Sequence, residues 1–264
     1  MDFSENQIER YARHIILAEV GGVGQAKLLD AKVLVIGAGG LGSPVLMYLA
    51  AAGVGTIGII DDDTVSLSNL QRQIAHTTAR VGQQKTVSAR QTIADLNPEV
   101  RVVEHTERLT AANALVVIGG YNVIADGCDN FATRFLVNDA CHIAGKTLVS
   151  AAVLRFDGQL ATYKSHLGGA NPCYRCVFPE APPDGLIPTC AEGGVLGALA
   201  GTMGTLQATE VLKEILGIGD SLSGWLMIYD GLATSFRKVK VRPDPACKLC
   251  GAQGSITDLS AHAA

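Results

Sequence analysis

The segment GAGGLG at positions 37–42 has the glycine spacing of a phosphate-binding turn. It follows the continuous apolar run KVLVI and precedes an apolar stretch, which places it between a strand and a helix. At such a turn the glycines let the backbone approach a phosphate, and the free N–H groups of the helix bind the anion. Asp61 lies about twenty residues further on, at the end of the next predicted strand, where a carboxylate commonly holds a ribose hydroxyl. These features predict a nucleotide, and they fit a nicotinamide-dependent oxidoreductase as well as an ATP-dependent enzyme.

A polar segment after Asp61 separates these two interpretations. It contains Asp63, Asn69, Arg72, Gln73 and Lys85. Each cation taken alone would fit a solvated loop about equally well. Behind one glycine loop, however, an Asn, an Arg and a Lys suit the crowded negative charge of a triphosphate, and such cations stabilise a pyrophosphate leaving group. We therefore predict ATP, because the oxidoreductase interpretation leaves Asn69, Arg72 and Lys85 without a role.

Asp129 and Asn130 lie just past another predicted buried strand, at the carboxyl end where the ligands of doubly wound sheets gather. Mg²⁺ in proteins takes one or two carboxylates together with phosphate oxygens and water, so a carboxylate beside a triphosphate is a natural ligand. The alternative is an Asx turn or an N-cap for the helix predicted at 130–144. The neighbouring ATP motifs favour magnesium at Asp129.

Two CxxC pairs, Cys173/Cys176 and Cys247/Cys250, lie far apart in the sequence. Together they supply a tetrahedral thiolate site for Zn²⁺. Redox-active pairs would need adjacent helix N-termini, whereas these pairs lie in segments rich in proline and glycine. Because four thiolates leave no open coordination position, we predict a structural zinc that ties the C-terminal strands to the first CxxC loop.

Cys190 precedes a helix predicted at 193–216, and a helix N-terminus can activate a thiol. The residue types alone leave two interpretations open, a nucleophile or a small buried residue. Cys128 and Cys141 lie on apolar elements and are predicted to be core residues. The histidines show no metal-binding or triad spacing, so none receives a role.

Alternating strand and helix patterns predict an α/β fold with a doubly wound, largely parallel Rossmann-like sheet. The predicted strands cover 32–37, 56–61, 100–105, 121–126 and 147–153, and the predicted helices cover 5–18, 24–30, 42–53, 83–95 and 130–144. Beyond 150 the rhythm changes to an exposed strand at 156–164 and a β-like pair at 225–241. The chain is therefore divided into N-terminal helices (1–30), a nucleotide-binding region (31–150), a β-containing region with the zinc clamp (151–252) and a disordered tail (253–264).

The composition narrows the class of protein. The 264 residues are 48% hydrophobic and only 17% charged, which favours a well-buried core and an apolar interface between subunits. A formal net charge of −4 gives no general attraction to nucleic acid or to an anionic membrane. The N-terminus is acidic and amphipathic, unlike a secretion signal, so we expect a cytoplasmic protein. Apolar stretches at 33–60 and 193–212 are interrupted by glycines and polar residues, which fits buried elements better than membrane spans.

The motifs GAGGLGSPV, DDDTVSLSNLQRQ, GQQK, DGCDN, the two CxxC pairs and TCAEGGVLG occur in this order and closely resemble the MoeB/ThiF group of adenylyltransferases, relatives of the ubiquitin-activating enzyme. The resemblance extends from about residue 5 to residue 251. It implies a homodimer that binds ATP and Mg²⁺. It further implies that the C-terminal carboxylate of a ubiquitin-like sulfur carrier ending in Gly-Gly attacks the α-phosphate.

The resemblance also implies roles for individual residues. Gly39 and Gly40 would face the phosphates, Asp61 the ribose and Asp129 the magnesium, while Asn69, Arg72 and Lys85 would contact phosphates. The predicted nucleotide-binding set is completed by Gly42, Asp63, Gln73 and Asn130. Arg13 would enter the ATP site of the neighbouring subunit, and the predicted catalytic residues are Arg13, Arg72, Lys85, Asp129 and Cys190. The carrier tail would run through a groove under region 151–252, lined by Arg134, Asn138 and Arg155.

Two further expectations concern sulfur. Eukaryotic relatives continue into a rhodanese domain, so the resemblance implies a separate sulfur donor, either a cysteine desulfurase or a rhodanese. Cys190 matches the crossover cysteine of the family, although some members adenylate without needing that thiol.

The carriers of molybdopterin and thiazole biosynthesis remain alternatives, and the segments LSNLQRQ and CYRC favour the molybdopterin-synthase small subunit type.

Overall fold

The computed structural model describes residues 3–183, 185–186 and 190–263, except for the side chains of Cys190 and Ala191. The helices are α1 (Glu5–Ile15), α2 (Gly21–Asp30), α3 (Gly42–Ala51), α4 (Lys85–Leu96), α5 (Ala114–Gly119), α6 (Phe131–Ile143), α7 (Tyr174–Val177), α8 (Cys190–Gly193) and α9 (Gly197–Leu216). The strands are β1 (Lys32–Ile36), β2 (Thr56–Ile60), β3 (Arg101–His105), β4 (Val123–Asp126), β5 (Thr147–Leu154), β6 (Asp157–Tyr163), β7 (Trp225–Asp230) and β8 (Ser235–Lys240). Most predicted elements are present with shifted ends, and the short helices α5, α7 and α8 were missed.

The described strands form one sheet in the order β3-β2-β1-β4-β5-β6-β7-β8. Neighbours from β3 to β5 are parallel, and those from β5 to β8 are antiparallel. The predicted doubly wound, largely parallel sheet is confirmed, and the C-terminal strands extend it instead of forming a sheet of their own. The strand order reverses between β1 and β4, where doubly wound sheets bind their ligands.

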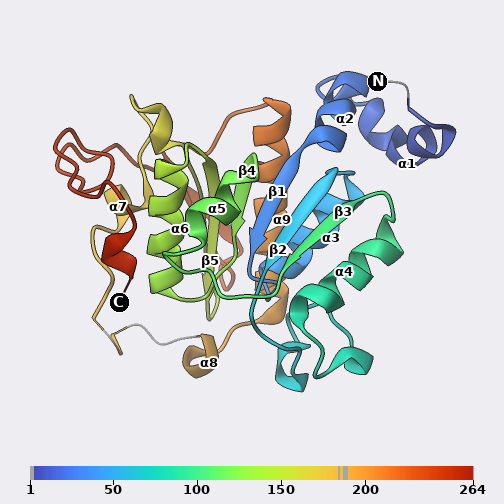
Figure 1. Cartoon of the computed structure of the whole chain (residues 1–264), viewed down its shortest axis with the longest axis horizontal. Helices are drawn as coiled ribbons and strands as arrows, with labels where there is room; N and C mark the ends of the chain where they lie inside the picture. The colour runs from blue at the N-terminus through green and yellow to red at the C-terminus, as the bar shows by residue number, and fades with distance from the viewer. Residues whose placement is uncertain (1–2, 184, 187–189, 264) are drawn as a thin grey trace.

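Both faces of the parallel part are buried, which explains its continuous apolar runs. Along β1, Val33 and Val35 belong to the core that contains α3, α4 and α9, whereas Leu34 and Ile36 belong to the core that contains α5 and α6. Figure 1 shows α6 and α9 on opposite sides of the sheet. None of the described helices, α9 included, combines the length and hydrophobicity needed to cross a membrane.

The N-terminal helix α1 packs at the edge of the sheet where the parallel strands begin. Ser4 and Gln7 form a capping box that fixes its first turn. Tyr11 is buried against Gly53, where a Cβ would lie 2.5 Å from the Tyr11 ring, and its hydroxyl accepts a hydrogen bond from Asn97 Nδ2 at 2.9 Å. Gly53 and Asn97 follow α3 and α4, immediately before β2 and β3. In Figure 1, α1 therefore lies at the end of the molecule opposite to α8.

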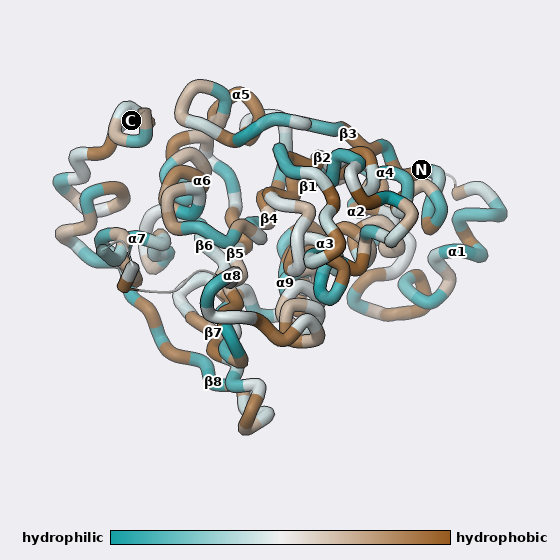
Figure 2. Tube along the Cα trace, turned by 90° about the horizontal axis from the view of Figure 1, so that it is seen from below, coloured by the Kyte–Doolittle hydropathy of each residue, from teal (hydrophilic) through white to brown (hydrophobic). Residues whose placement is uncertain are grey.

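Two predictions for the C-terminal half are wrong. The strand expected to be exposed at 156–164 is β6, which is largely buried because it lies between β5 and β7 and packs on Met203. The tail expected to be disordered folds back onto the protein. Leu259 is only 5% exposed, and His262 Nε2 lies 2.8 Å from a carboxylate oxygen of Asp139 on α6. Figure 2 shows that the β7–β8 hairpin, in contrast, extends outward from the rest of the chain.

Candidate active site

A cavity of about 700 Å³ opens at the carboxyl ends of β1, β2 and β4 and continues along β5, β6 and β7. Parallel strands end at the same edge, so residues distant in sequence converge there. The predicted site residues that line it are Gly39, Gly40, Asp61, Asp63, Arg72, Gln73, Lys85, Asp129 and Asn130. Gly42, Asn69 and Arg13 do not line it in the described part of the chain.

The glycines of the turn between β1 and α3 have different structural requirements. A Cβ on Gly42 would lie 1.8 Å from the carbonyl oxygen of Gly37, so the turn itself requires glycine at 42. A Cβ on Gly39 would meet nothing nearer than Gln73 Nε2 at 3.7 Å. The protein therefore leaves space at Gly39 on the cavity wall, as expected where a phosphate approaches the backbone.

These two glycines give a matched pair of predictions. Gly42→Ala should lower the free energy of unfolding by about 1–3 kcal/mol, because the added methyl group collides with backbone. Gly39→Ala should leave stability within about 0.5 kcal/mol of the original protein but weaken ATP binding at least about tenfold. Urea denaturation and titration calorimetry with ATP measure the two effects. Unchanged ATP affinity in Gly39→Ala would exclude close approach of a phosphate at this position.

Asp61 joins the glycine turn to the loop after β2. One carboxylate oxygen accepts the N–H of Ala38 at 2.8 Å, and the other accepts the N–H of Asp63 at 2.9 Å. Burial raises the pKa of Asp61, and the positive charge of Lys85 opposes this shift. Asp61 therefore shapes the cavity as well as lining it.

Two cations of the site, Lys85 and Arg72, line the cavity. Lys85, the first residue of α4, is 6% exposed and its Nζ lies 2.8 Å from a carboxylate oxygen of Asp63. Arg72 donates to the carbonyl of Ser68 at 3.2 Å. Gln73 is also buried, and its Oε1 has no hydrogen-bond partner among the described residues. Two cations and a free amide oxygen thus border the space next to the glycine turn.

Asn69 was predicted to contact phosphate, but its Oδ1 accepts the N–H of Ser66 at 3.2 Å and caps a short 3-10 turn. Its amide therefore shapes the loop that presents Arg72 and Gln73. The role of Asn69 toward a nucleotide stays a prediction.

His76, for which spacing predicted no role, supports the glycine turn through the carbonyl group of Ala38. Its Nε2 lies 2.8 Å from the carbonyl oxygen of Ala38, and its Nδ1 lies 2.9 Å from the hydroxyl of Ser88 on α4. Burial lowers the pKa of His76, and the positive charge of Lys85 adds to the shift while the bond to Ala38 opposes it. A neutral ring that donates through Nε2 and accepts from Ser88 satisfies both contacts. No local motif marks this residue, because its contact joins positions 38 residues apart.

The turn after β4 presents Asp129 to the cavity with a free carboxylate. Asn130, not Asp129, caps α6, since its Oδ1 accepts the N–H of Thr133 at 2.8 Å. The Asx turn belongs to Asp126, whose carboxylate accepts the N–H of Cys128 at 3.0 Å. Asp129 is exposed, and its carboxylate has no hydrogen bond or ion pair with the described residues. The capping alternative for Asp129 is therefore wrong, and its oxygens are available to a cation.

The two CxxC pairs meet in space. The Sγ atoms of Cys173, Cys176, Cys247 and Cys250 all lie within 4.8 Å of one another. Neighbouring Sγ–Sγ distances of 3.4, 3.5 and 3.8 Å agree with the spacing of about 3.8 Å expected when sulfurs surround Zn²⁺ tetrahedrally at about 2.3 Å. The donor set fits a closed tetrathiolate site, and it ties α7 to the segment after β8.

Several other predicted residues have different places. The backbone of Cys190 begins α8, but its side chain lies outside the described part of the chain. Arg13 is exposed on α1, away from the cavity of its own chain. Asn138 does not line a groove, because it is 2% exposed and accepts the N–H of Tyr174 at 2.8 Å. Arg155 forms the tight β5–β6 turn with φ of 54° and is likewise absent from the cavity wall among the described residues.

The sheet, the glycine turn and its cations, the free carboxylate and the cysteine cluster define a doubly wound nucleotide-binding protein with a thiolate clamp. Its sequence matches the ThiF family over residues 11–249. It is 48% identical to the sulfur carrier protein adenylyltransferase of Thermus thermophilus over 98% of this chain and 96% of that protein. The chain belongs to the ThiF family and is an adenylyltransferase.

Other relatives extend the comparison. The chain is 49% identical to the adenylyltransferase and sulfurtransferase MOCS3 of Sus scrofa, covering 97% of this chain but 56% of that protein. Among solved structures, E. coli MccB superimposes with a TM-score of 0.81 over 96% of this chain and 74% of that chain, at 22% identity. At this identity the similarity to MccB concerns the fold.

Proposed function

We propose that this enzyme uses ATP to adenylate the C-terminal glycine of a small ubiquitin-like sulfur carrier. The cavity is the observation that carries the proposal. Its first end is lined by the glycine turn, the two cations and Asp129, and its other end continues along β6 and β7. An extended chain end can thus reach the nucleotide from the antiparallel half of the sheet. The name of the Thermus relative, at 48% identity, supports a sulfur carrier as the substrate.

The chemistry requires positioning and charge stabilisation rather than a general base. The carrier carboxylate is already ionised at neutral pH. One of its oxygens attacks the α-phosphorus, the bond from that phosphorus to the bridging oxygen of the β-phosphate breaks, and pyrophosphate leaves with the electron pair. Arg72 and Lys85 stabilise the negative charge that develops on the leaving group. Gly39 and Gly40 allow the phosphates to approach, and Asp129 would hold a Mg²⁺, which would neutralise negative charge on the phosphates.

The cysteine cluster is proposed to hold a structural Zn²⁺. Its four thiolates complete a tetrahedral shell, which leaves no position for a reacting ligand. The cluster clamps α7 and the C-terminal segment, close to where β6 and β7 form the far wall of the cavity. Its proposed function is to hold that wall in place.

The favoured carrier is of the molybdopterin-synthase small subunit type, on the sequence of LSNLQRQ and CYRC, with the thiazole carrier as the alternative. We propose a separate sulfur donor, a cysteine desulfurase or a rhodanese.

The thiol of Cys128 lines the cavity. Burial raises the pKa of this thiol well above the ordinary value, and the carboxylate of Asp126 adds to the shift. A buried neutral thiol is a poor nucleophile.

Carrier-dependent exchange of labelled pyrophosphate into ATP tests the proposal. Each candidate carrier is compared with the same carrier lacking its last glycine, which should give no exchange. The favoured carrier should show the larger kcat/KM. Absence of exchange with every Gly-Gly carrier would contradict a sulfur carrier as the substrate.

We also propose a homodimer in which Arg13 completes the partner's site, since Arg13 is exposed and remote from the cavity of its own chain. Arg13→Ala and Asp129→Ala should each lack exchange activity. Mixing the two should restore roughly a quarter of it at equal amounts, because random mixing gives about half heterodimers, each with one intact site. If the mixture stays inactive while native mass spectrometry shows heterodimers, the shared site is wrong.

A further inference from the structure

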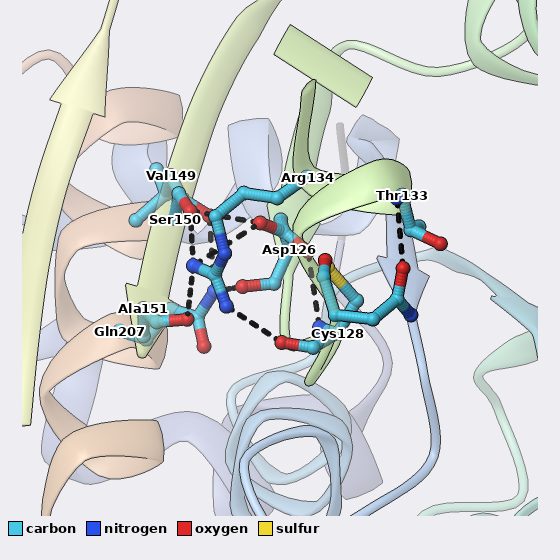
Figure 3. A network of polar contacts seen from close by, with 9 residues as sticks. Asp126, Cys128, Thr133, Arg134, Val149, Ser150, Ala151 and Gln207 are labelled. Carbon is cyan, nitrogen blue, oxygen red and sulfur yellow. Dashed lines mark hydrogen bonds and ion pairs between the residues drawn. The ribbon is translucent and has the colours of Figure 1, made fainter. Parts of the chain in front are cut away.

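Arg134 on α6 is 8% exposed, and its guanidinium connects the turn after β4 to the middle of β5 (Figure 3). Nη2 donates to the carbonyl oxygen of Cys128 at 2.7 Å. Nη1 donates to Ser150 Oγ at 3.1 Å and to the carbonyl oxygen of Ala151 at 2.9 Å. Nη1 also lies 3.6 Å from a carboxylate oxygen of Asp126, which is completely buried. The side chain thus joins the turn after β4 to β5.

The same turn is held from its other side by α9. Gln207 Nε2 donates to the carbonyl oxygens of Asp126 and Val149 at 2.8 and 2.9 Å (Figure 3). The Asp126 carboxylate accepts the N–H of Cys128 and the hydroxyl of Ser150, the latter at 2.8 Å. The backbone immediately before Asp129 is therefore fixed by side chains from three elements. Beyond Asp129, the Asn130 cap fixes the start of α6.

This arrangement needs an arginine for geometric reasons. A planar guanidinium with five donors can contact Cys128, Ser150 and Ala151 at once, whereas a lysine ammonium is a point charge on a flexible stem. Lysine would still compensate the buried charge of Asp126, but it cannot reproduce the fork. Charge compensation and backbone positioning can therefore be separated experimentally.

We infer that Arg134 is a positioning residue, which sets the direction of the Asp129 carboxylate by fixing the carbonyl of Cys128. The inference rests on the proposed function, in which Asp129 holds the divalent cation of the ATP complex. Arg134 lines the cavity, and its Nη1 and Nη2 groups donate to Ser150, Ala151 and Cys128 of the protein itself. The prediction that Arg134 lines the groove agrees with its place on the cavity wall, and its contact with a carrier tail stays a prediction.

Arg134→Lys tests this inference. We expect the Mg²⁺ concentration for half-maximal exchange to rise about tenfold or more, as when a residue supporting a metal ligand is changed. The KM for the carrier should change less than twofold. The matched control is Arg175→Lys, because Arg175 forms a bidentate pair with buried Asp139 at 2.8 and 2.7 Å and does not line the cavity among the described residues. This control should lower stability without changing the Mg²⁺ dependence.

Further measurements keep each outcome decisive. Electron paramagnetic resonance titration of Mn²⁺ with ATP, without carrier, should show the same weakening in Arg134→Lys. If Arg134→Lys does not fold, Gln207→Met takes its place in the test. It removes the other anchor without leaving a buried charge, and it should raise the Mg²⁺ concentration for half-maximal exchange by a smaller factor. Unchanged cation dependence in a folded variant, or an equal shift in Arg175→Lys, overturns the inference. The unmodified enzyme could bind Mn²⁺ with ATP, and Arg134→Lys could weaken this binding, while no carrier supports exchange. That result would contradict the proposed function but not the role of Arg134.

Discussion

Asp129→Asn should reduce carrier-dependent ATP–pyrophosphate exchange by roughly 10²–10³-fold while the chain stays folded. The carboxylate is exposed on the cavity wall and has no partner among the described residues, so the neighbouring structure does not depend on it. The amide keeps the shape of the side chain but removes the negative charge that would bind Mg²⁺. Radiolabelled exchange measures the loss, and circular dichroism melting measures the retained fold.

Asp95→Asn is the appropriate control for this variant. Asp95 is an exposed aspartate on α4 that lies 3.7 Å from Arg80, and such surface pairs contribute little to stability. It should keep full exchange activity. If Asp129→Asn retained more than a tenth of the activity at saturating Mg²⁺, Asp129 would not be the main metal ligand.

Cys247→Ser should remove the bound metal and lower the free energy of unfolding by about 3 kcal/mol or more, because metal binding at such a site contributes directly to folding. The bound zinc should fall from about one atom per chain to none, since Cys247 is one of the four thiols that cluster among the described residues. The glycine turn and Arg72 lie on other elements, so ATP binding should persist below the lowered melting temperature. Mass spectrometry of the metal content and thermal melting measure these effects.

Cys141→Ala provides the comparison, because Cys141 is 2% exposed on α6 but is not part of the cluster. It should keep its zinc and lose only the stability associated with a small cavity, about 1 kcal/mol. If Cys247→Ser kept its metal, or if it melted like Cys141→Ala, the structural zinc site would be wrong.

The sequence by itself determined the parallel part of the fold and the nucleotide end of the site. Apolar runs such as 32–36 and 56–60 are continuous because helices cover both faces of the sheet. The glycine turn and the CxxC pairs are equally readable, because local backbone geometry and metal coordination constrain residue type at fixed spacing. Each of these features depends on neighbours in the chain or on a spacing that chemistry sets.

The tertiary structure decided what depends on distant partners. It placed 156–164 inside the sheet rather than at its surface, and it docked the tail through His262 on Asp139, a contact across 123 residues. It also gave His76 a role under the glycine turn, and it left Asp129 free because Asp126 and Asn130 make the local hydrogen bonds. Whether a side chain is a cap, a core residue or a free ligand depends on which groups the fold brings beside it. Burial and hydrogen-bond competition therefore decide these roles, and no local pattern encodes them.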